Sequence, residues 1–207
     1  MTKQRNYTLG SMSKIITKNI LIIGILTILG AVIGGLYANN KKTTNYFADS
    51  TVMINANLNN TDYKNSALLA EKGMMKTYEE IAGNQESMLI AKKYLPKEMR
   101  KSLTVEEMMS AVKVNSSPDS LILNFSVKTE SSTDSVEIAN AVAKAATLIL
   151  PKYSQNNSIV KVLTRANKKN VNSNTTPSVK KYIVMGASLG LLVGMIFSFS
   201  ITTWKHM

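Results

Sequence analysis

Residues 19–37 read NILIIGILTILGAVIGGLY and contain no charged side chain. The uncharged interval runs from Lys18 to Lys41, which is long enough to cross a bilayer, because a spanning helix needs about 20 mostly apolar residues. Apolar side chains would lie on every face of this helix, and a helix without a polar face is buried either in a protein core or in lipid. The absence of charge over this length favours lipid. We therefore predict a first transmembrane helix over residues 19–40.

A second uncharged interval separates Lys181 from Lys205. It has the length and composition of another spanning segment. Tyr182 and Trp204 stand at its ends, where amphipathic rings favour the membrane interface. We predict a second transmembrane helix over residues 182–204.

Both predicted spans carry glycines at helical spacing. Gly30 and Gly34 form one small-xxx-small pair, and Gly186, Gly190 and Gly194 recur every four residues. Such patterns let two helices approach each other closely. We predict these five glycines as helix-packing residues, with a partner within the chain or in another copy. Glycines tolerated in a span without any partner are the alternative.

The N-terminal segment, residues 1–18, is basic. It carries Lys3, Arg5, Lys14 and Lys18 and no acidic residue. A basic flank before an apolar run also opens a secretory signal peptide, whose apolar run is about 7–15 residues long. The run here is longer, so we predict an uncleaved membrane anchor.

The orientation prediction rests on this first span, which usually sets the topology. Its basic flank places residues 1–18 in the cytoplasm, and the second span then returns the tail, residues 205–207, to the same side. The central region is long enough to be translocated largely regardless of its charge. We predict a cell-membrane protein with both termini cytoplasmic and the central domain extracellular, although a count of basic residues near the membrane slightly favours the opposite orientation.

Composition excludes several classes of function. The chain has 207 residues, 25 Lys and Arg, 13 Asp and Glu, and a formal net charge of +12. All acidic residues lie between the two apolar intervals, and the basic residues of the central region are spread out rather than clustered or interleaved with aromatics. Nucleic-acid binding would require such clustering, so no nucleic-acid partner is predicted. The basic excess instead favours attraction to anionic lipid head groups or to an acidic polymer, and a merely soluble basic surface is the default. An acidic or neutral polysaccharide is a candidate partner.

Enzymatic chemistry is not predicted. The chain has no Cys, and its one His is the penultimate residue, His206. A phosphate-binding loop of the GxxxxGK[ST] type is also missing from the sequence. Adjacent acidic pairs occur at residues 79–80 and 106–107, but neighbouring side chains on a helix point to different faces. We predict a non-catalytic protein without a metal or cofactor site.

Three stretches of the central region have strand patterns. Residues 46–58 alternate with period 2, which predicts a half-buried strand. Residues 121–127 predict a second strand after a turn at 117–119, and residues 159–163 predict a third. The expected buried side of the first strand is Val52, Ile54, Ala56 and Leu58.

Helices are predicted between these strands. One covers residues 66–95, is interrupted at Gly83-Asn84 and ends before Pro96. A capping box at Thr104-Val-Glu-Glu107 opens a short helix through Met108, Met109 and Val112, and Asp134-Ser-Val-Glu137 opens a third that Pro151 ends. The expected buried stripes are Leu69, Gly73, Met74, Thr77 and Ile81 in the first helix, and Val136, Ala139, Ala143, Ala146 and Ile149 in the last.

The order strand, helix, helix, strand, helix, strand predicts a small sheet covered by helices on one face. This mixed α/β domain occupies residues 41–166. Residues 167–181 are rich in Asn, Ser, Thr and Lys and predict a polar linker, in which Pro177 gives an extended lead-in to the second span. The predicted fold class is therefore a membrane α+β protein, with two transmembrane helices flanking one extracytoplasmic mixed α/β domain.

Four segments have the order and spacing found in a known family. They are YFADSTVMI at 46–54, MKTYEEI at 75–81, the helix at 134–146, and PSVKK at 177–181 before the Gly-rich span. The chain resembles the Wzz-type chain-length determinants, and more closely the polysaccharide co-polymerases of Gram-positive capsule and exopolysaccharide clusters, the CpsC/CapA type. The resemblance covers nearly the whole chain.

The resemblance implies a homo-oligomeric membrane protein that regulates the chain length or export of capsular polysaccharide or exopolysaccharide made by a Wzy-type polymerase. It also implies modulation of a separate cytoplasmic tyrosine kinase through the tail after the second span. Only Lys205, His206 and Met207 follow that span here, and they are the candidate kinase-contact residues. An envelope sensor or adhesion protein with the same topology and no role in glycan assembly is the alternative.

Overall fold

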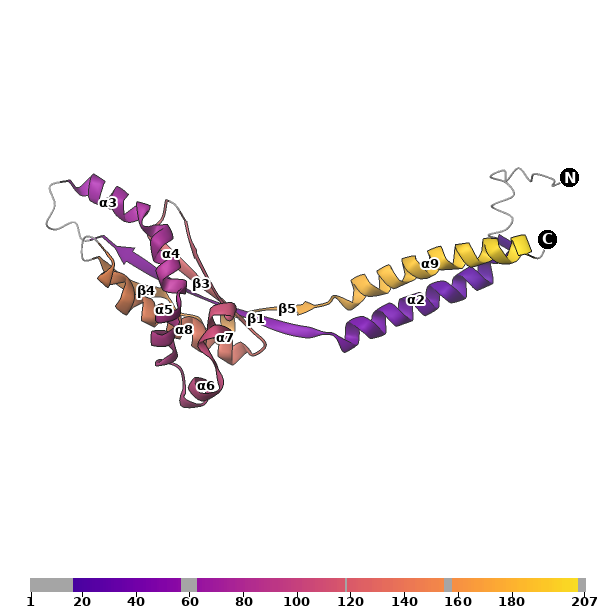
Figure 1. Ribbon diagram of the computed structural model, residues 1–207, viewed down its shortest axis with the longest axis horizontal. Helices are drawn as coiled ribbons and strands as arrows, with labels where there is room; N and C mark the ends of the chain where they lie inside the picture. Colours follow the sequence, from indigo (N-terminus) through magenta and orange to yellow (C-terminus); the bar gives the residue numbers. More distant parts are fainter. Residues whose placement is uncertain (1–16, 57–62, 118, 155–157, 205–207) are drawn as a thin grey trace. The chain divides into compact units, whose positions relative to one another are not determined.

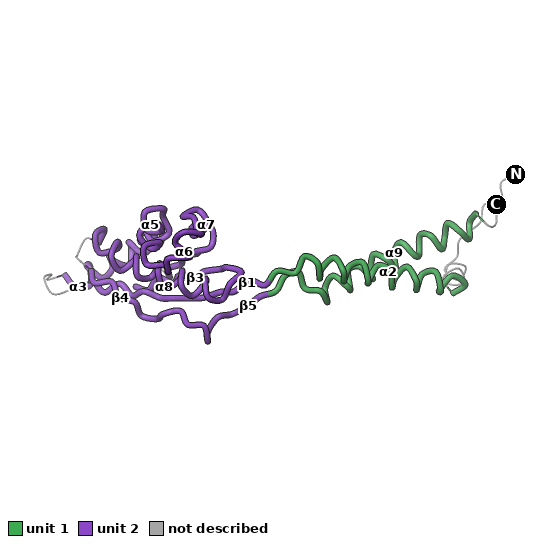
Figure 2. Tube along the Cα trace, turned by 90° about the horizontal axis from the view of Figure 1, so that it is seen from below, with its two compact units in different colours: residues 1–43, 175–207 green, residues 44–174 purple. Residues whose placement is uncertain are grey.

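The computed structural model describes residues 17–56, 63–117, 119–154 and 158–204 (Figure 1). The chain divides into two compact units (Figure 2). One unit comprises residues 1–43 and 175–207, and the other comprises residues 44–174. The end of the predicted first strand, with Asn57 and Leu58, lies outside the described residues.

The first unit is a pair of long apolar helices, α2 (Ile20–Asn40) and α9 (Val179–Trp204). Both are long and apolar enough to cross a membrane, by length and composition. Helix α9 begins before the predicted span, so that Lys180 and Lys181 stand in its first turn. The prediction of two apolar helices flanking a central domain is confirmed.

The second unit contains a small sheet. Its strand order is β2-β3-β1-β4, with each of these neighbouring pairs antiparallel, and β5 also pairs with β1. The strands are β1 (Thr43–Asn55), β2 (Val112–Ser116), β3 (Ile122–Thr129), β4 (Ile159–Thr164) and β5 (Asn172–Thr176).

Helices lie on one side of this sheet, as Figure 2 shows for α5 and α7. Helix α8 contacts β3 and β4, and α4 contacts β2. The helices of this unit are α3 (Lys64–Gly73), α4 (Met75–Gly83), α5 (Gln85–Lys92), α6 (Lys97–Ser102), α7 (Val105–Ala111) and α8 (Ser132–Ile149), with short 3-10 helices η1 (Leu150–Lys152) and η2 (Lys168–Asn170).

The core lies between the covered face of the sheet and α8. Alternation along β1 buries Ala48, Val52 and Ile54, and the β3 partners of Ala48 and Val52, which are Val127 and Leu123, are buried too. The hydroxyl of Ser50 donates to the carbonyl oxygen of Ala139 at 2.8 Å, so β1 and α8 approach closely. The small side chains of α8 permit this approach. The predicted buried positions of α8 are all confirmed: Val136, Ala139, Ala143, Ala146 and Ile149.

The predicted buried stripe before Pro96 is only partly right. Leu69 is 67% exposed, whereas Met75, Tyr78 and Ala82 are buried, one position after the predicted residues. The predicted interruption at Gly83-Asn84 is confirmed, because α4 ends at Gly83 and α5 begins at Gln85, and a further break at Met74 separates α3 from α4. The buried stripe runs across that further break, from Glu71 through Met75 and Tyr78 to Ala82. Apolar residues lie on both candidate faces of α4, so periodicity alone does not show which of the two faces is buried.

Two strands differ from the sequence predictions. The short helix α7 ends at Ala111, and Val112, predicted as helical, begins β2. Residues 167–181, predicted as a polar linker, contain η2 and β5, and Pro177 stands between β5 and α9. A short polar strand pairs through its backbone, so β5 leaves no hydrophobic alternation in the sequence.

The capping box predicted at Thr104 and Glu107 is confirmed.

Candidate functional site: the glycine-packed helix pair

The two apolar helices run antiparallel. Asn19, just before α2, donates from Nδ2 to the Thr202 hydroxyl near the end of α9, at 3.0 Å. At the other end of the pair, the Tyr37 and Tyr182 rings stack with their centroids 5.8 Å apart. The residues that precede α2 and those that end α9 are therefore held together at one end of the pair.

Three of the predicted packing glycines face one another at the centre of this contact. A Cβ atom built on Gly30 would collide with the carbonyl oxygen of Gly186, and one built on Gly186 would collide with the carbonyl oxygen of Gly30. A Cβ atom on Gly34 would collide with the carbonyl oxygen of Tyr182. The two backbones approach so closely that no larger residue fits at these positions without separating the helices.

The remaining predicted glycines extend the same contact along α9. A Cβ atom on Gly190 would meet the carbonyl oxygen of Leu26, and one on Gly194 would lie 3.0 Å from the Cα atom of Ile23. Gly24, by contrast, has nothing within 4 Å of such an atom. The structure thus brings all five predicted glycines into one interface, and their partner is the other apolar helix of the same chain.

Most serine and threonine hydroxyl groups described on these helices donate a hydrogen bond to a backbone carbonyl of the same helix. The Thr202 hydroxyl donates to the Ser198 carbonyl at 2.8 Å, and the Thr27 hydroxyl donates to the Ile23 carbonyl at 2.8 Å. Ser188 and Thr203 make the same bond one turn back. Such bonding lets a polar side chain lie in an apolar environment at low cost.

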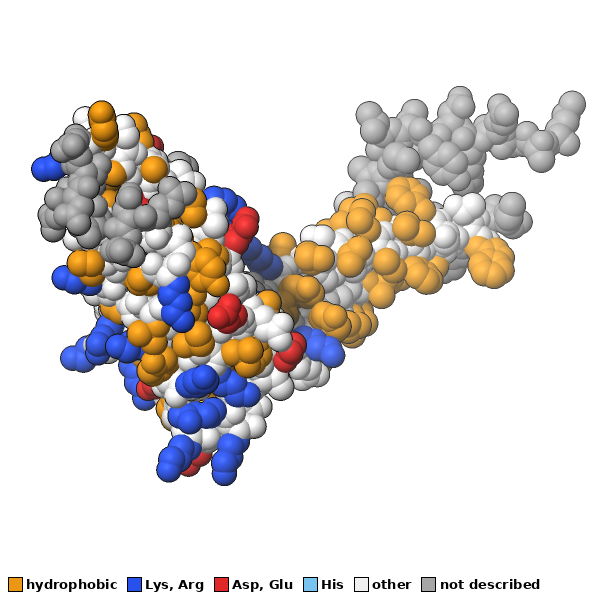
Figure 3. Space-filling view, turned by 60° about the vertical axis from the view of Figure 1, so that its left-hand side comes forward, with side chains coloured by type: hydrophobic (Ala, Val, Ile, Leu, Met, Phe, Trp, Pro, Cys, Tyr) orange, Lys and Arg blue, Asp and Glu red, His pale blue; other side chains and the backbone are white. Residues whose placement is uncertain are grey.

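Most side chains of the pair point away from the chain itself. Helices α2 and α9 expose Ile, Leu and Val side chains along their whole length, and Figure 3 shows one apolar face of the pair. Exposed apolar area of this extent marks a lipid or protein contact rather than a solvent-facing surface.

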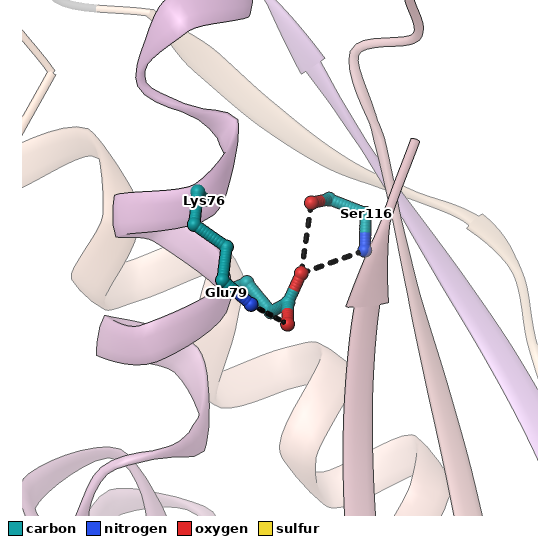
Figure 4. A network of polar contacts seen from close by, with 3 residues as sticks. All are labelled: Lys76, Glu79 and Ser116. Atoms are coloured by element: carbon teal, nitrogen blue, oxygen red, sulfur yellow. Dashed lines mark hydrogen bonds and ion pairs between the residues drawn. The ribbon is translucent and has the colours of Figure 1, made fainter. Parts of the chain in front are cut away.

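A polar network lies in the second unit, between α4 and β2 (Figure 4). Lys76 Nζ lies 2.6 Å from Glu79 Oε1, and Ser116 donates to Glu79 Oε2 from its backbone N–H at 3.0 Å and from its hydroxyl at 2.8 Å. The Lys76 hydrogen bond is the main cause that lowers the pKa of Glu79. Glu80 is exposed to solvent, so the two adjacent acidic side chains lie in different environments. The network joins a helix to a strand.

A second polar contact is fully buried. The Tyr78 hydroxyl donates to Glu71 Oε1 at 2.7 Å, and Glu71 is 1% exposed. Burial, with a further contribution from the hydrogen bond to Glu71, raises the pKa of Tyr78 to about 12. Tyr78 therefore stays protonated at neutral pH and ties α3 to α4. Sequence reasoning did not find this pair, because an acid in a helix is ordinarily solvated.

A cleft of about 260 Å³ lies beside α8 and β4. The polar and aromatic residues that line it are Tyr94, Glu137, Asn140, Lys144 and Arg165. Asn140 exchanges two hydrogen bonds with the backbone of Ala166, at 3.1 Å and 3.0 Å, and so fixes the end of β4. The cleft thus combines an aromatic ring with two cations and one carboxylate.

Across the described ranges, no three His, Cys, Asp or Glu side chains are grouped so that they could hold a metal ion. The candidate kinase-contact residues Lys205, His206 and Met207 lie outside the described residues. No protein-family model and no curated protein matches the chain.

Proposed function

We propose that the chain is a cell-membrane protein in which α2 and α9 both span the bilayer. The observation that supports this is the antiparallel, glycine-packed contact of two uncharged helices whose outer side chains are apolar. Antiparallel spans place residues 17–19 and 202–204 on one side of the membrane and the second unit on the other. The basic flank of α2 favours the cytoplasm for the ends and the outside for the domain.

Within this topology the chain acts as a non-catalytic polysaccharide co-polymerase that regulates the length or export of a capsular polysaccharide or exopolysaccharide. The resemblance of four segments to the CpsC/CapA type supports the proposal. Two of those segments, residues 46–54 and 134–146, belong to β1 and α8, which pack against each other through Ser50 and Ala139. They are thus parts of one core.

The same resemblance supports a homo-oligomer that works beside a Wzy-type polymerase and modulates a separate cytoplasmic tyrosine kinase. The exposed cations and Tyr94 of the cleft at α8 offer a surface for polymer. Co-purification of the full chain with a polymerase or a kinase tests these partners.

Deleting the gene and sizing the surface polysaccharide by gel electrophoresis tests the function. We expect an altered amount or length distribution, restored by the wild-type gene. An unchanged polysaccharide would contradict the proposal and would favour an envelope sensor or adhesion protein.

The topology is tested separately, with reporter fusions at Met1 and at Asn60. A reporter active only in the cytoplasm should work at Met1 and fail at Asn60. The reverse result, or activity at both positions, would overturn the proposed orientation whatever the polysaccharide does.

A further inference from the structure

The two apolar helices leave a groove along one side of their contact. Its volume is about 550 Å³, and apolar side chains of both helices line it, among them Leu29 and Ile33 of α2 and Met185 and Leu189 of α9. Gly30 and Gly186 also line it, at the close contact of the two backbones. A groove lined almost entirely by apolar atoms suits a hydrocarbon chain.

The groove has one charged end. Tyr37 and Tyr182 line it at the end where α2 finishes and α9 begins. Lys41 and Lys42 follow α2 at this end, and Lys180 and Lys181 stand in the first turn of α9; all four are exposed. The sequence has no Asp or Glu in residues 1–43 or 175–207, so no acid of this unit neutralises them.

The length of the groove matches one leaflet of a bilayer. From Leu26 to Tyr37 the lining residues extend over roughly 16 Å, at about 1.5 Å per helical residue. The hydrocarbon core is about 30 Å thick, so a single leaflet is about half of that. A lipid chain entering beside Tyr37 would therefore reach the middle of the bilayer at the groove's far end.

We propose that this groove binds one hydrocarbon chain of an anionic phospholipid, whose head group lies among the four lysines. The inference rests on the membrane insertion proposed above, but not on the role in polysaccharide assembly. It assigns a lipid site to a surface that the co-polymerase function does not itself require.

Charge is also what favours a lipid over a second copy of the chain. Another copy in the same orientation would bring its own four lysines to the same end of the groove, and like charges repel. An anionic head group instead neutralises them, at a gain of roughly fivefold in affinity for each cation near an anionic surface.

The test compares lipids retained by the purified full-length protein. The protein is equilibrated with equal amounts of phosphatidylglycerol and phosphatidylcholine with identical acyl chains, and bound lipid is counted by native mass spectrometry. We expect one retained phosphatidylglycerol per chain. Replacing all four lysines by Gln should abolish the preference for the anionic lipid, and replacing Lys92, Lys93, Lys97 and Lys101 of the other unit should leave it unchanged.

A matched pair of variants tests the groove itself. Ile33, which lines the groove, is 66% exposed, and Ile28, which is not among the groove residues, is 65% exposed. Ile33→Trp should fill the groove and lower retention at least several-fold, whereas Ile28→Trp should leave it at the wild-type level. Equal retention of both lipids by the wild type, or equal behaviour of the two Trp variants, would overturn the proposal.

The natural absence of cysteine allows a check for the competing occupant. Ile33→Cys should not form a disulfide-linked dimer in the membrane, and an efficient dimer from Ile33→Cys but not from Ile28→Cys would place a second copy in the groove and overturn the lipid site. Polysaccharide sizing in the gene-deletion strain is scored independently. Unchanged polysaccharide in that strain, with phosphatidylglycerol still retained by the purified protein, would leave this inference standing while the proposed function fails.

Discussion

At the scale of single residues, Gly186 leaves no room for a side chain. Its missing side chain lets the carbonyl oxygen of Gly30 approach its Cα, and the same is true in reverse. The obstacle to a larger residue is backbone, which cannot rotate away as a flexible side chain can. Gly24, on the same helix as Gly30, meets no such obstacle.

We therefore expect Gly186→Leu to separate α2 from α9, at a cost of about 1–3 kcal/mol or more for overpacking. The measurement is the steady-state amount of full-length protein in the membrane fraction, by immunoblot, together with complementation of the deletion strain. Gly24→Leu is the matched control and should behave as wild type. Equal losses in both variants would show that the contact is not decisive.

Glu79 makes the second prediction at this scale. Its lowered pKa means that the folded state favours the ionised carboxylate, mainly through the hydrogen bond from Lys76 and further through those from Ser116. The stabilisation is complete above the ordinary pKa of a Glu side chain, about 4.3, and is lost as the pH falls through the lowered value. Glu79→Gln should destabilise the second unit by about 0.2–1 kcal/mol at neutral pH, because Gln can still accept the Ser116 hydrogen bonds and loses only the attraction to the exposed Lys76.

Thermal unfolding of the full chain, followed by circular dichroism, checks this dependence. The difference in melting temperature between wild type and Glu79→Gln should be largest at neutral pH and should shrink at acidic pH. Glu80→Gln, at an exposed neighbour, should show little difference at either pH. If the difference in melting temperature between wild type and Glu79→Gln stayed constant down to acidic pH, the role assigned to the Glu79 charge would be contradicted.

At the scale of elements, the close approach of α8 to the sheet depends on alanine. Ala139 is fully buried, and its carbonyl oxygen accepts the hydrogen bond from Ser50. Ala139→Leu should push the helix from β1 and destabilise the domain by about 1–3 kcal/mol. Lys144→Leu on the exposed side of the same helix is the control, and thermal unfolding of the full chain is the measurement. Equal melting temperatures in the two variants would contradict this packing.

The elements also show what the sequence can predict. The alternation of β1 and the stripe of α8 were readable because one face of each is buried and apolar while the other is solvated. The phase of α4 was not readable, because Met74 and Met75 are adjacent apolar residues whose side chains point to different faces of the helix. The sequence did not predict β5, because this short polar strand forms through backbone pairing with β1. Its side chains show no hydrophobic alternation that would indicate a strand.

For the candidate site, the spacing of the glycines predicted a helix contact but left its partner open. A GxxxG pattern specifies a face and not what lies against that face. The identity of the partner became clear only from the reciprocal contact of Gly30 and Gly186. The Glu71–Tyr78 pair could not have been predicted, since its burial depends on how α3 and α4 pack after the break.

At the scale of the whole molecule, the antiparallel pair brings distant parts of the chain together. With Tyr37 and Tyr182 both replaced by Cys, a short thiol-reactive cross-linker should join the two positions within one chain, because the native rings stack. The product should run as a monomer on a denaturing gel. A pair made at Tyr37 and Trp204, which stand at opposite ends, should not react, and linked dimers from Tyr37 and Tyr182 would point to pairing between chains instead.

The glycine contact has a thermodynamic consequence for how the chain responds to heat. The second unit is held largely by apolar burial from water, so its unfolding carries a large positive heat-capacity change. Within a bilayer, α2 and α9 gain no such term from each other, because lipid tails are as apolar as their side chains, and van der Waals packing at Gly30 and Gly186 holds them. With α2 and α9 in a bilayer, as proposed, the stability of the domain should depend on temperature along a more strongly curved line than the stability of the helix pair.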